Sequence, residues 1–148
     1  MAEIEVQGMR QFRRELKKLG NKGLTDALKD EHQKVAQDVV DQAQRNATKW
    51  HSRALEYAAS SYRAARTVNG AVVRGGSAAI PWAGAAEFGA EHNVTRYRRT
   101  GSYVGYNQFM TPLKGGFTIY PAIWDLEEQI SRTYISGIDR ALRDAFPD

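Results

Sequence analysis

The stretch "LTDALKDEHQKVAQDVVDQAQRNA", residues 24–47, decides the fold because it predicts one helix of about seven turns. Its apolar residues recur every three or four positions, the period of a single helix face. This stripe consists of Leu24, Leu28, Val35, Val39 and Ala43. The stripe is narrow and much of the remaining surface is charged, so we expect this helix to lie on the outside of a small domain.

The segments on either side predict short strands and further helices. Residues 2–8 alternate between apolar and polar side chains, which indicates a short strand, and residues 9–20 return to a helical period. The pattern around residues 50–57 is compatible with more helix. Residues 62–74 predict a hairpin, because Asn69-Gly70 is the pair that a tight type I′ turn favours.

The last part of the chain predicts a loop, a strand and a second long helix. Pro81 opens a short helical turn, and residues 91–116 form the longest irregular stretch. Residues 116–120 resemble a strand that Pro121 stops, and an amphipathic helix follows. The apolar face of this helix consists of Ile123, Leu126, Ile130, Tyr134, Ile138 and Leu142.

These elements predict a single domain over residues 1–148, with 91–116 as a long loop insertion. The expected fold class is α+β: a small, mostly antiparallel sheet packed by long N-terminal and C-terminal helices. A hydrophobic content of 42% and a charged content of 26% are ordinary for a globular protein with a real core.

Charge is distributed unevenly along the chain. The total is +4, but residues 49–116 carry nine Lys and Arg against three Asp and Glu, whereas residues 117–148 carry three against six. Surfaces of opposite charge can therefore meet within one subunit or between subunits.

The absence of cysteine excludes disulfides, thiol catalysis and thiolate metal sites. No stretch has the length and apolarity of a signal peptide or a membrane span. We therefore expect a soluble protein, made and used in a cytoplasm.

Catalytic and metal-binding patterns were sought without success. His32, His51 and His92 lack the spacing of metal ligands, and His32, on the apolar stripe, is expected to be buried with a backbone partner. Glu87 is the one acid in the window "PWAGAAEFGA", residues 81–90, and no base or second acid accompanies it. We expect it to form an ion pair with an arginine, and we expect no catalytic residue, metal or cofactor.

The same window has a packing interpretation. Its small residues allow close approach, Trp82 and Phe88 are expected to anchor the core, and Gly89 is expected to adopt a positive φ. The plain alternative is that the whole segment is only interior packing.

Arginines and tyrosines alternate within the predicted loop. This composition is used both by single-strand nucleic-acid platforms and by protein–protein interfaces, and we favour the interface because no nucleic-acid motif accompanies it. With Glu87, the candidate interface residues are Arg96, Tyr97, Arg98, Arg99, Tyr103, Tyr106 and Phe109.

The order of these pieces resembles the tail-completion, or minor tail component, family of long-tailed bacteriophages, which includes the minor tail protein Z type. The resemblance begins with "IEVQGMRQFRRELKKLG" and includes an aromatic–small–Glu-Phe-Gly element and a "YPAI" element before the last helix. Ala90 departs from the Thr or Ser usual after Phe-Gly. The residues that match the two later elements are Trp82, Ala83, Glu87, Phe88, Gly89, Tyr120, Pro121 and Ala122.

This resemblance implies a structural virion protein of the head–tail junction, or neck, made in the cytoplasm of the host bacterium. Copies would form a ring, expected to be six-fold, around the DNA channel, and would complete the tail and join it to the head. Its partners would be other neck and tail proteins and DNA passing without sequence-specific binding; no membrane and no reaction would be involved. A tail terminator, a head-side stopper ring, a basic DNA-binding module and an enzyme around Glu87 are the alternatives.

Overall fold

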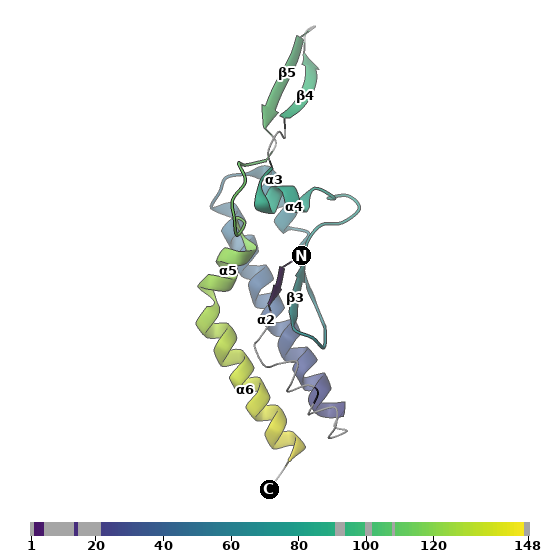
Figure 1. Cartoon of the computed structure of the whole chain (residues 1–148), viewed down its shortest axis with the longest axis vertical. Helices are drawn as coiled ribbons and strands as arrows, with labels where there is room; N and C mark the ends of the chain where they lie inside the picture. The colour runs from purple at the N-terminus through teal and green to yellow at the C-terminus, as the bar shows by residue number, and fades with distance from the viewer. Residues whose placement is uncertain are drawn as a thin grey trace.

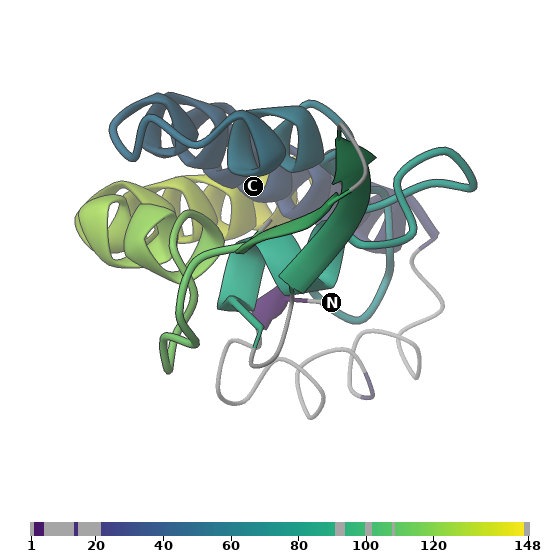
Figure 2. The same ribbon diagram turned by 90° about the horizontal axis from the view of Figure 1, so that it is seen from above.

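Two long helices lie side by side along the length of the protein. The computed structural model describes residues 2–4, 14, 22–90, 94–99, 102–107 and 109–146. Helix α2 (Lys22–Thr48) runs beside α6 (Glu127–Ala145), and the short α5 (Ile119–Asp125) precedes α6 (Figure 1). Seen along the long axis, α2 and the α5–α6 pair form one layer (Figure 2).

A three-stranded antiparallel sheet covers another side of α2. Its order is β1 (Ala2–Ile4), β3 (Ala71–Arg74) and β2 (Arg63–Ala65). The central strand β3 buries Ala71, Val72 and Val73, and α2 packs against β3 and β2. The α+β fold class, with a small antiparallel sheet and long helices, is confirmed.

Helix α2 is the centre of the core, not its outer layer. All five residues of the predicted stripe are buried, but the buried surface is wider than the stripe. The sheet packs on one side of α2 and α5 and α6 pack on another, so two faces are covered. The additional buried residues are His32, Ala36, Val40, Asn46 and Ala47.

A turn separates α2 from the next helix. His51 has φ 50, the one positive φ at a non-glycine among the described residues. Ser52 then caps α3 (Arg53–Ala59) by accepting a hydrogen bond from the Leu55 N–H at 3.3 Å. A helical pattern near residues 50–57 is therefore confirmed only from Arg53 onward.

The β2–β3 hairpin is confirmed, but its predicted tight turn is wrong. A two-residue turn at Asn69-Gly70 would pair Val68 with Ala71, whereas Ala65 pairs with Val72. Neither Asn69 nor Gly70 has a positive φ. The Thr67 hydroxyl instead donates to the Gly70 carbonyl and accepts from the Gly70 N–H, which closes a wider loop.

The predicted irregular loop at 91–116 is wrong over much of its length. Strands β4 (Val94–Arg99) and β5 (Ser102–Asn107) form an antiparallel ladder from the pair Val94 and Asn107 to the pair Arg99 and Ser102. Both strands contain β-branched and aromatic residues, which favour strand structure. Figure 1 shows this hairpin projecting beyond α3 and the short α4 (Ala83–Phe88), at the end opposite the C-terminus.

The strand predicted before Pro121 is also wrong. Gly115 and Gly116 have φ 94 and 72 and turn the chain into α5, which contains Pro121 as its third residue. Proline is tolerated there because the first N–H groups of a helix have no acceptor within the helix. Pro121 therefore lies inside a first turn and does not end a strand.

The C-terminal helix is interrupted at Leu126, where α5 ends and α6 begins. On the predicted face, Ile130 and Tyr134 are buried and Leu142 is exposed. Of the helix expected at residues 9–20, only Arg14 is described, and it is helical; the rest of that prediction lies outside the described residues.

Candidate functional site

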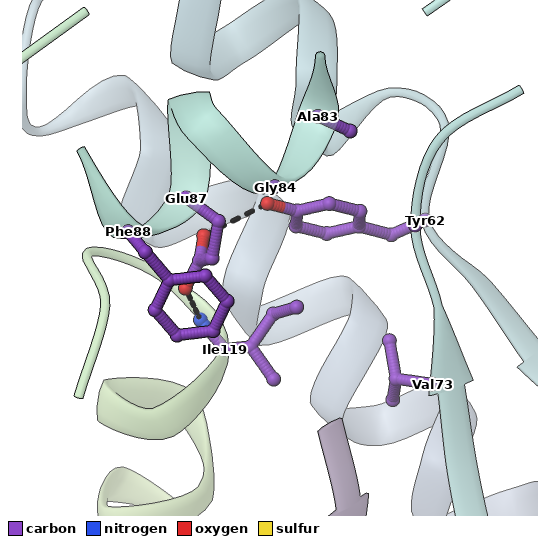
Figure 3. Close-up of a pocket in the computed structure, with 8 residues that line it drawn as sticks. Tyr62, Val73, Ala83, Gly84, Glu87, Phe88 and Ile119 are labelled. Carbon is purple, nitrogen blue, oxygen red and sulfur yellow. Dashed lines mark hydrogen bonds between the residues drawn. The ribbon is translucent and has the colours of Figure 1, made fainter. Parts of the chain in front are cut away.

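Glu87, on α4, is a buried carboxylate that accepts four hydrogen bonds from its own chain. It is 2% exposed. Its Oε1 accepts from the backbone N–H groups of Thr118 (2.9 Å) and Ile119 (2.8 Å). Its Oε2 accepts from the Tyr62 hydroxyl (2.8 Å) and the Thr118 hydroxyl (2.5 Å). We call these four residues the Glu87 clasp; Figure 3 shows Tyr62 and Ile119 converging on the carboxylate.

The clasp corrects the expected ion pair, because neutral donors, not an arginine, hold the carboxylate. Thr118 and Ile119 open α5, and the N–H groups of a first helical turn lack partners within the helix. The Thr118 side chain makes no capping bond to α5, so Glu87 supplies the cap from another helix. The N-terminal end of a helix also favours a negative charge.

Tyr62 remains a neutral donor in this arrangement. Burial raises the pKa of its hydroxyl well above the ordinary range, and the nearby charge of Glu87 raises it further. An ionised Tyr62 would place two negative charges together in the interior, so the protonated hydroxyl is strongly favoured.

Further hydrogen bonds fasten the chain on both sides of the clasp. Trp50 donates its ring N–H to the Phe117 carbonyl (3.1 Å), and the Asn46 amide donates to the Thr118 carbonyl (3.4 Å). The Phe117 N–H donates to the backbone carbonyl of Glu87 (2.9 Å). The end of α2, the turn after it, α4 and the start of α5 are thereby joined at one point.

Gly89 allows the segment of residues 109–118, which we call the strap, to lie against α4. Its φ of 76 and ψ of 172 belong to a region essentially restricted to glycine, so the predicted positive φ is confirmed. A Cβ at this position would lie 2.6 Å from the Thr111 carbonyl oxygen and 2.7 Å from that of Met110. The Phe88 carbonyl accepts from the Leu113 N–H at 3.0 Å, which fixes the strap in place.

The two predicted aromatic anchors behave differently. Trp82 is half-buried between the rings of Tyr57 and Phe109, at centroid distances of 6.0 and 5.7 Å. Phe88 is 37% exposed and lies beside the Tyr120 ring, so the prediction of a core anchor is wrong for Phe88. Its exposure follows from its position at the last residue of α4, next to the strap.

Ala83 and Ala86 are buried, as close approach requires. Gly84 faces open space.

A small pocket adjoins the clasp (Figure 3). Its volume is about 50 Å³, room for a few water molecules. Among the described residues that line it, Glu87 and Tyr62 are the titratable ones, and each already bonds to the other. This arrangement can hold the fold together, but the lining offers no second acid or base for proton transfer.

His32 matches its prediction, since it is fully buried and its Nδ1 lies 3.0 Å from the Thr67 carbonyl oxygen, to which it donates. Its ring meets that of Tyr134 edge to face at 5.5 Å. Within the described part of the chain, His, Asp and Glu side chains form no group able to hold a metal ion.

The candidate interface residues fall into two places. Arg96, Arg98 and Arg99 lie with Tyr97 in β4, and Tyr103 and Tyr106 lie in β5. The ladder pairs Arg98 with Tyr103 and Tyr97 with Val104. Phe109 packs against Trp82 at the base of the hairpin, and Glu87 is enclosed in the body.

Sequence patterns did not predict several residues of the clasp or of the hydrogen bonds beside it. Tyr62, Thr118, Asn46 and Trp50 carry no motif of their own. The one available signal was Glu87 itself, since a lone acid in an apolar window must find donors when it is buried.

Large hydrophobic side chains are exposed in two areas. One area surrounds the strap, where the Trp50 ring contacts Phe117 and the Tyr57 ring stacks on Trp82. The other follows α6. The exposed members near the strap are Trp50, Tyr57, Phe88, Leu113 and Trp124, and those along α6 and at its end are Ile135, Leu142 and Phe146.

None of the described helices combines the length and apolarity that a membrane crossing requires. Comparisons of the chain with protein-family models, with curated proteins and with solved structures found no match.

Proposed function

We propose that this chain is a structural virion protein of the neck of a long-tailed bacteriophage. Copies form a ring around the DNA channel, complete the tail and join it to the head. The observation that carries the proposal is the convergence of the two stretches that resemble the tail-completion family. Glu87 caps α5 just before the "YPAI" stretch, and the Phe88 and Tyr120 rings lie 6.3 Å apart.

Three of the matching residues near this junction have roles that the fold explains. Gly89 admits the strap, Pro121 occupies a position where a helix needs no N–H, and Ala122 is fully buried. Residues that a family shares for folding are expected to meet in space in this way. The Glu87 carboxylate is buried, and all its hydrogen bonds hold segments of the chain together. This arrangement is consistent with a protein that works by shape and not by catalysis.

A ring also needs two different faces on each subunit, one for each neighbour. The exposed hydrophobic residues supply two such areas, one around the strap and one along α6. A tail terminator or a head-side stopper ring would use the same architecture and is a neighbouring assignment within this proposal.

The particle itself tests the proposal. In the phage or prophage that carries this gene, an early stop codon should yield filled heads and finished tails that remain separate under the electron microscope. Supplying the intact chain should restore joined particles, and a reconstruction should place a ring of it at the neck. Joined, infectious particles that lack the chain would overturn the proposal.

A DNA-binding module is the second candidate, favoured by the three arginines that β4 carries on a projecting hairpin. Phosphate contacts made by arginine weaken steeply as salt rises. Replacing Arg96, Arg98 and Arg99 with Ala should then abolish DNA binding at low salt. A flat binding curve for the unmodified chain at low salt would eliminate this candidate.

A further inference from the structure

The β4–β5 hairpin, which we call the arm, is joined by its own ladder, and no other described helix or strand packs extensively against it. Its two six-residue strands pair with each other, and no other described strand joins them. Figure 1 shows the arm extending past the rest of the protein. An isolated two-stranded hairpin is marginally stable in water, and both of its outer edges offer free backbone groups. A partner that pairs with or covers the arm would therefore stabilise it.

One face of α6 lacks a partner within the described chain. Ile135 is 69% exposed, Leu142 follows it seven positions later on the same side of the helix, and the exposed Phe146 lies just after the end of α6. Glu128 and Asp139 lie seven positions before and four after Ile135, so this face mixes acids with apolar side chains. We call it the α6 face.

The two acids of the α6 face can exchange their present ion-pair partners for an arginine of another molecule. Glu128 bonds to Arg132 at 3.1 Å and Asp139 bonds to Arg143 at 2.6 Å, and all four side chains are largely exposed. Exposed ion pairs of this kind contribute at most about 1 kcal/mol. An incoming arginine can share or replace them at little cost.

The arm has the complementary composition. Strand β4, "VTRYRR", contains three arginines and no acid, and β5, "SYVGYN", contains two tyrosines and no charge. Arginine and tyrosine are enriched at protein interfaces, where they meet acids and apolar surface. Two arms are less suited to each other because identical arginine-rich strands repel.

The arm and the α6 face lie at opposite ends of one molecule (Figure 1). A subunit cannot bring its own arm to its own α6 face without unfolding. We infer that the arm of one copy binds the α6 face of a second copy, in a head-to-tail contact. Such a contact uses two different surfaces and closes into a ring when the rotation permits. This inference rests on the ring formation within the proposed function.

Charge reversal with rescue tests this contact. One variant combines Arg96→Glu with Arg98→Glu, and a second combines Glu128→Arg with Asp139→Arg. Analytical ultracentrifugation of each alone should show dissociation at least about tenfold stronger than for the unmodified chain. Mixing the two variants should restore assembly, because each contact in an alternating head-to-tail arrangement then joins an arm and an α6 face of complementary charge.

Asp144→Arg is the matched control. Asp144 is exposed on the same helix but nine positions from Ile135, about half a turn away from the α6 face. The substitution changes the charge by the same amount as Asp139→Arg, but assembly should be unaffected. Thermal unfolding by circular dichroism should show that every variant remains folded.

Cross-linking locates the contact directly. A photoreactive phenylalanine analogue in place of Tyr97, in chains labelled with heavy nitrogen, should link to α6 peptides of unlabelled copies. Three results would overturn the inference. Cross-links could join only peptides of the same isotope label, they could reach a surface other than α6, or the chain could stay monomeric at every concentration. If both charge-reversed variants still assemble, the arm contact is rejected, but the proposed ring at the neck is not. If the contact forms but the chain is absent from phage particles, only the phage proposal is rejected.

Discussion

The Glu87 clasp and the arm organise the chain in opposite ways. The clasp joins segments that lie up to 56 positions apart in sequence, through buried hydrogen bonds that converge on α4 and the start of α5. The arm joins two neighbouring strands through their ladder, and within the described part of the chain no other helix or strand packs extensively against them. The difference indicates that stability is concentrated in the body, while the arm is left free to act on another molecule.

Removing the clasp carboxylate should have the largest effect on the stability of the body. Glu87→Ala leaves two backbone N–H groups and two hydroxyls buried without their acceptor, and should lower the free energy of unfolding by roughly 3–5 kcal/mol. Urea denaturation followed by circular dichroism measures the loss. Glu87→Gln keeps one acceptor oxygen and should cost about 1–2 kcal/mol. Equal stability of all three proteins would show that the clasp is not a stabilising feature.

Two glycines of the same segment sharpen the comparison. Gly89→Ala forces a Cβ against the strap backbone in a conformation reserved for glycine, and should cost about 2–4 kcal/mol. Gly84→Ala adds a methyl group in open space within α4 and should be neutral or stabilise by up to about 1 kcal/mol. Thermal melts of the pair provide the measurement. Similar melting temperatures would mean that the strap does not depend on close approach at Gly89.

Alkaline pH should weaken the body through its buried tyrosines. Burial raises the pKa of Tyr134 to about 12, with the nearby Glu31 charge adding to the rise and contact with the Ala71 backbone opposing it. The folded state thus holds the proton more tightly than the unfolded state, whose tyrosines titrate near pH 10. The stabilisation is complete below about pH 10 and is lost as the pH rises towards about 12.

Comparing the unfolding free energy at about pH 8 and about pH 11 tests this prediction. The unmodified chain should lose up to about 1.4 kcal/mol more than Tyr134→Phe over this interval. Tyr57→Phe, at an exposed ring, serves as the control and should behave like the unmodified chain. An identical pH dependence in all three proteins would exclude Tyr134 as the cause.

Deleting the arm should have the smallest effect on the body. Replacing residues 94–107 with a short Gly-Ser linker should change the unfolding free energy by less than about 0.5 kcal/mol, since the body makes few contacts with these strands. Hydrogen exchange of the intact monomer should likewise be fast in β4 and β5 and slow in α2. A large loss of stability, or slow exchange in the arm of the monomer, would mean that the body holds the arm.

The sequence analysis succeeded where a periodic or a local conformational signal was strong. The helical period of Leu24, Leu28 and Val35 identified α2, and Gly89 was recognised as a position that needs a positive φ. The apolar period of α2 also predicted that His32 is buried, and the His32 ring indeed pairs with a backbone carbonyl in the core.

The failures occurred where the deciding partner is distant in sequence. Pro121 is compatible with the end of a strand and with the first turn of a helix, and only the cap from Glu87 selects the helix. The wide loop closed by Thr67 replaced the expected turn at Asn69-Gly70 because the β2–β3 register differs from the one that a tight turn imposes. Glycine and polar residues in 91–116 concealed the β-branched and aromatic residues of β4 and β5, and neither strand has the period-two pattern that predicts a strand.

The arm leaves and re-enters the body at a single closed point. The Ala90 N–H donates to the Met110 carbonyl at 3.1 Å, so the backbone is already joined beneath the hairpin. The hairpin between Ala90 and Met110 can therefore be lengthened, shortened or replaced by a foreign sequence without changing the path of the rest of the chain. This position is therefore a natural graft site for an affinity tag or a fluorescent label.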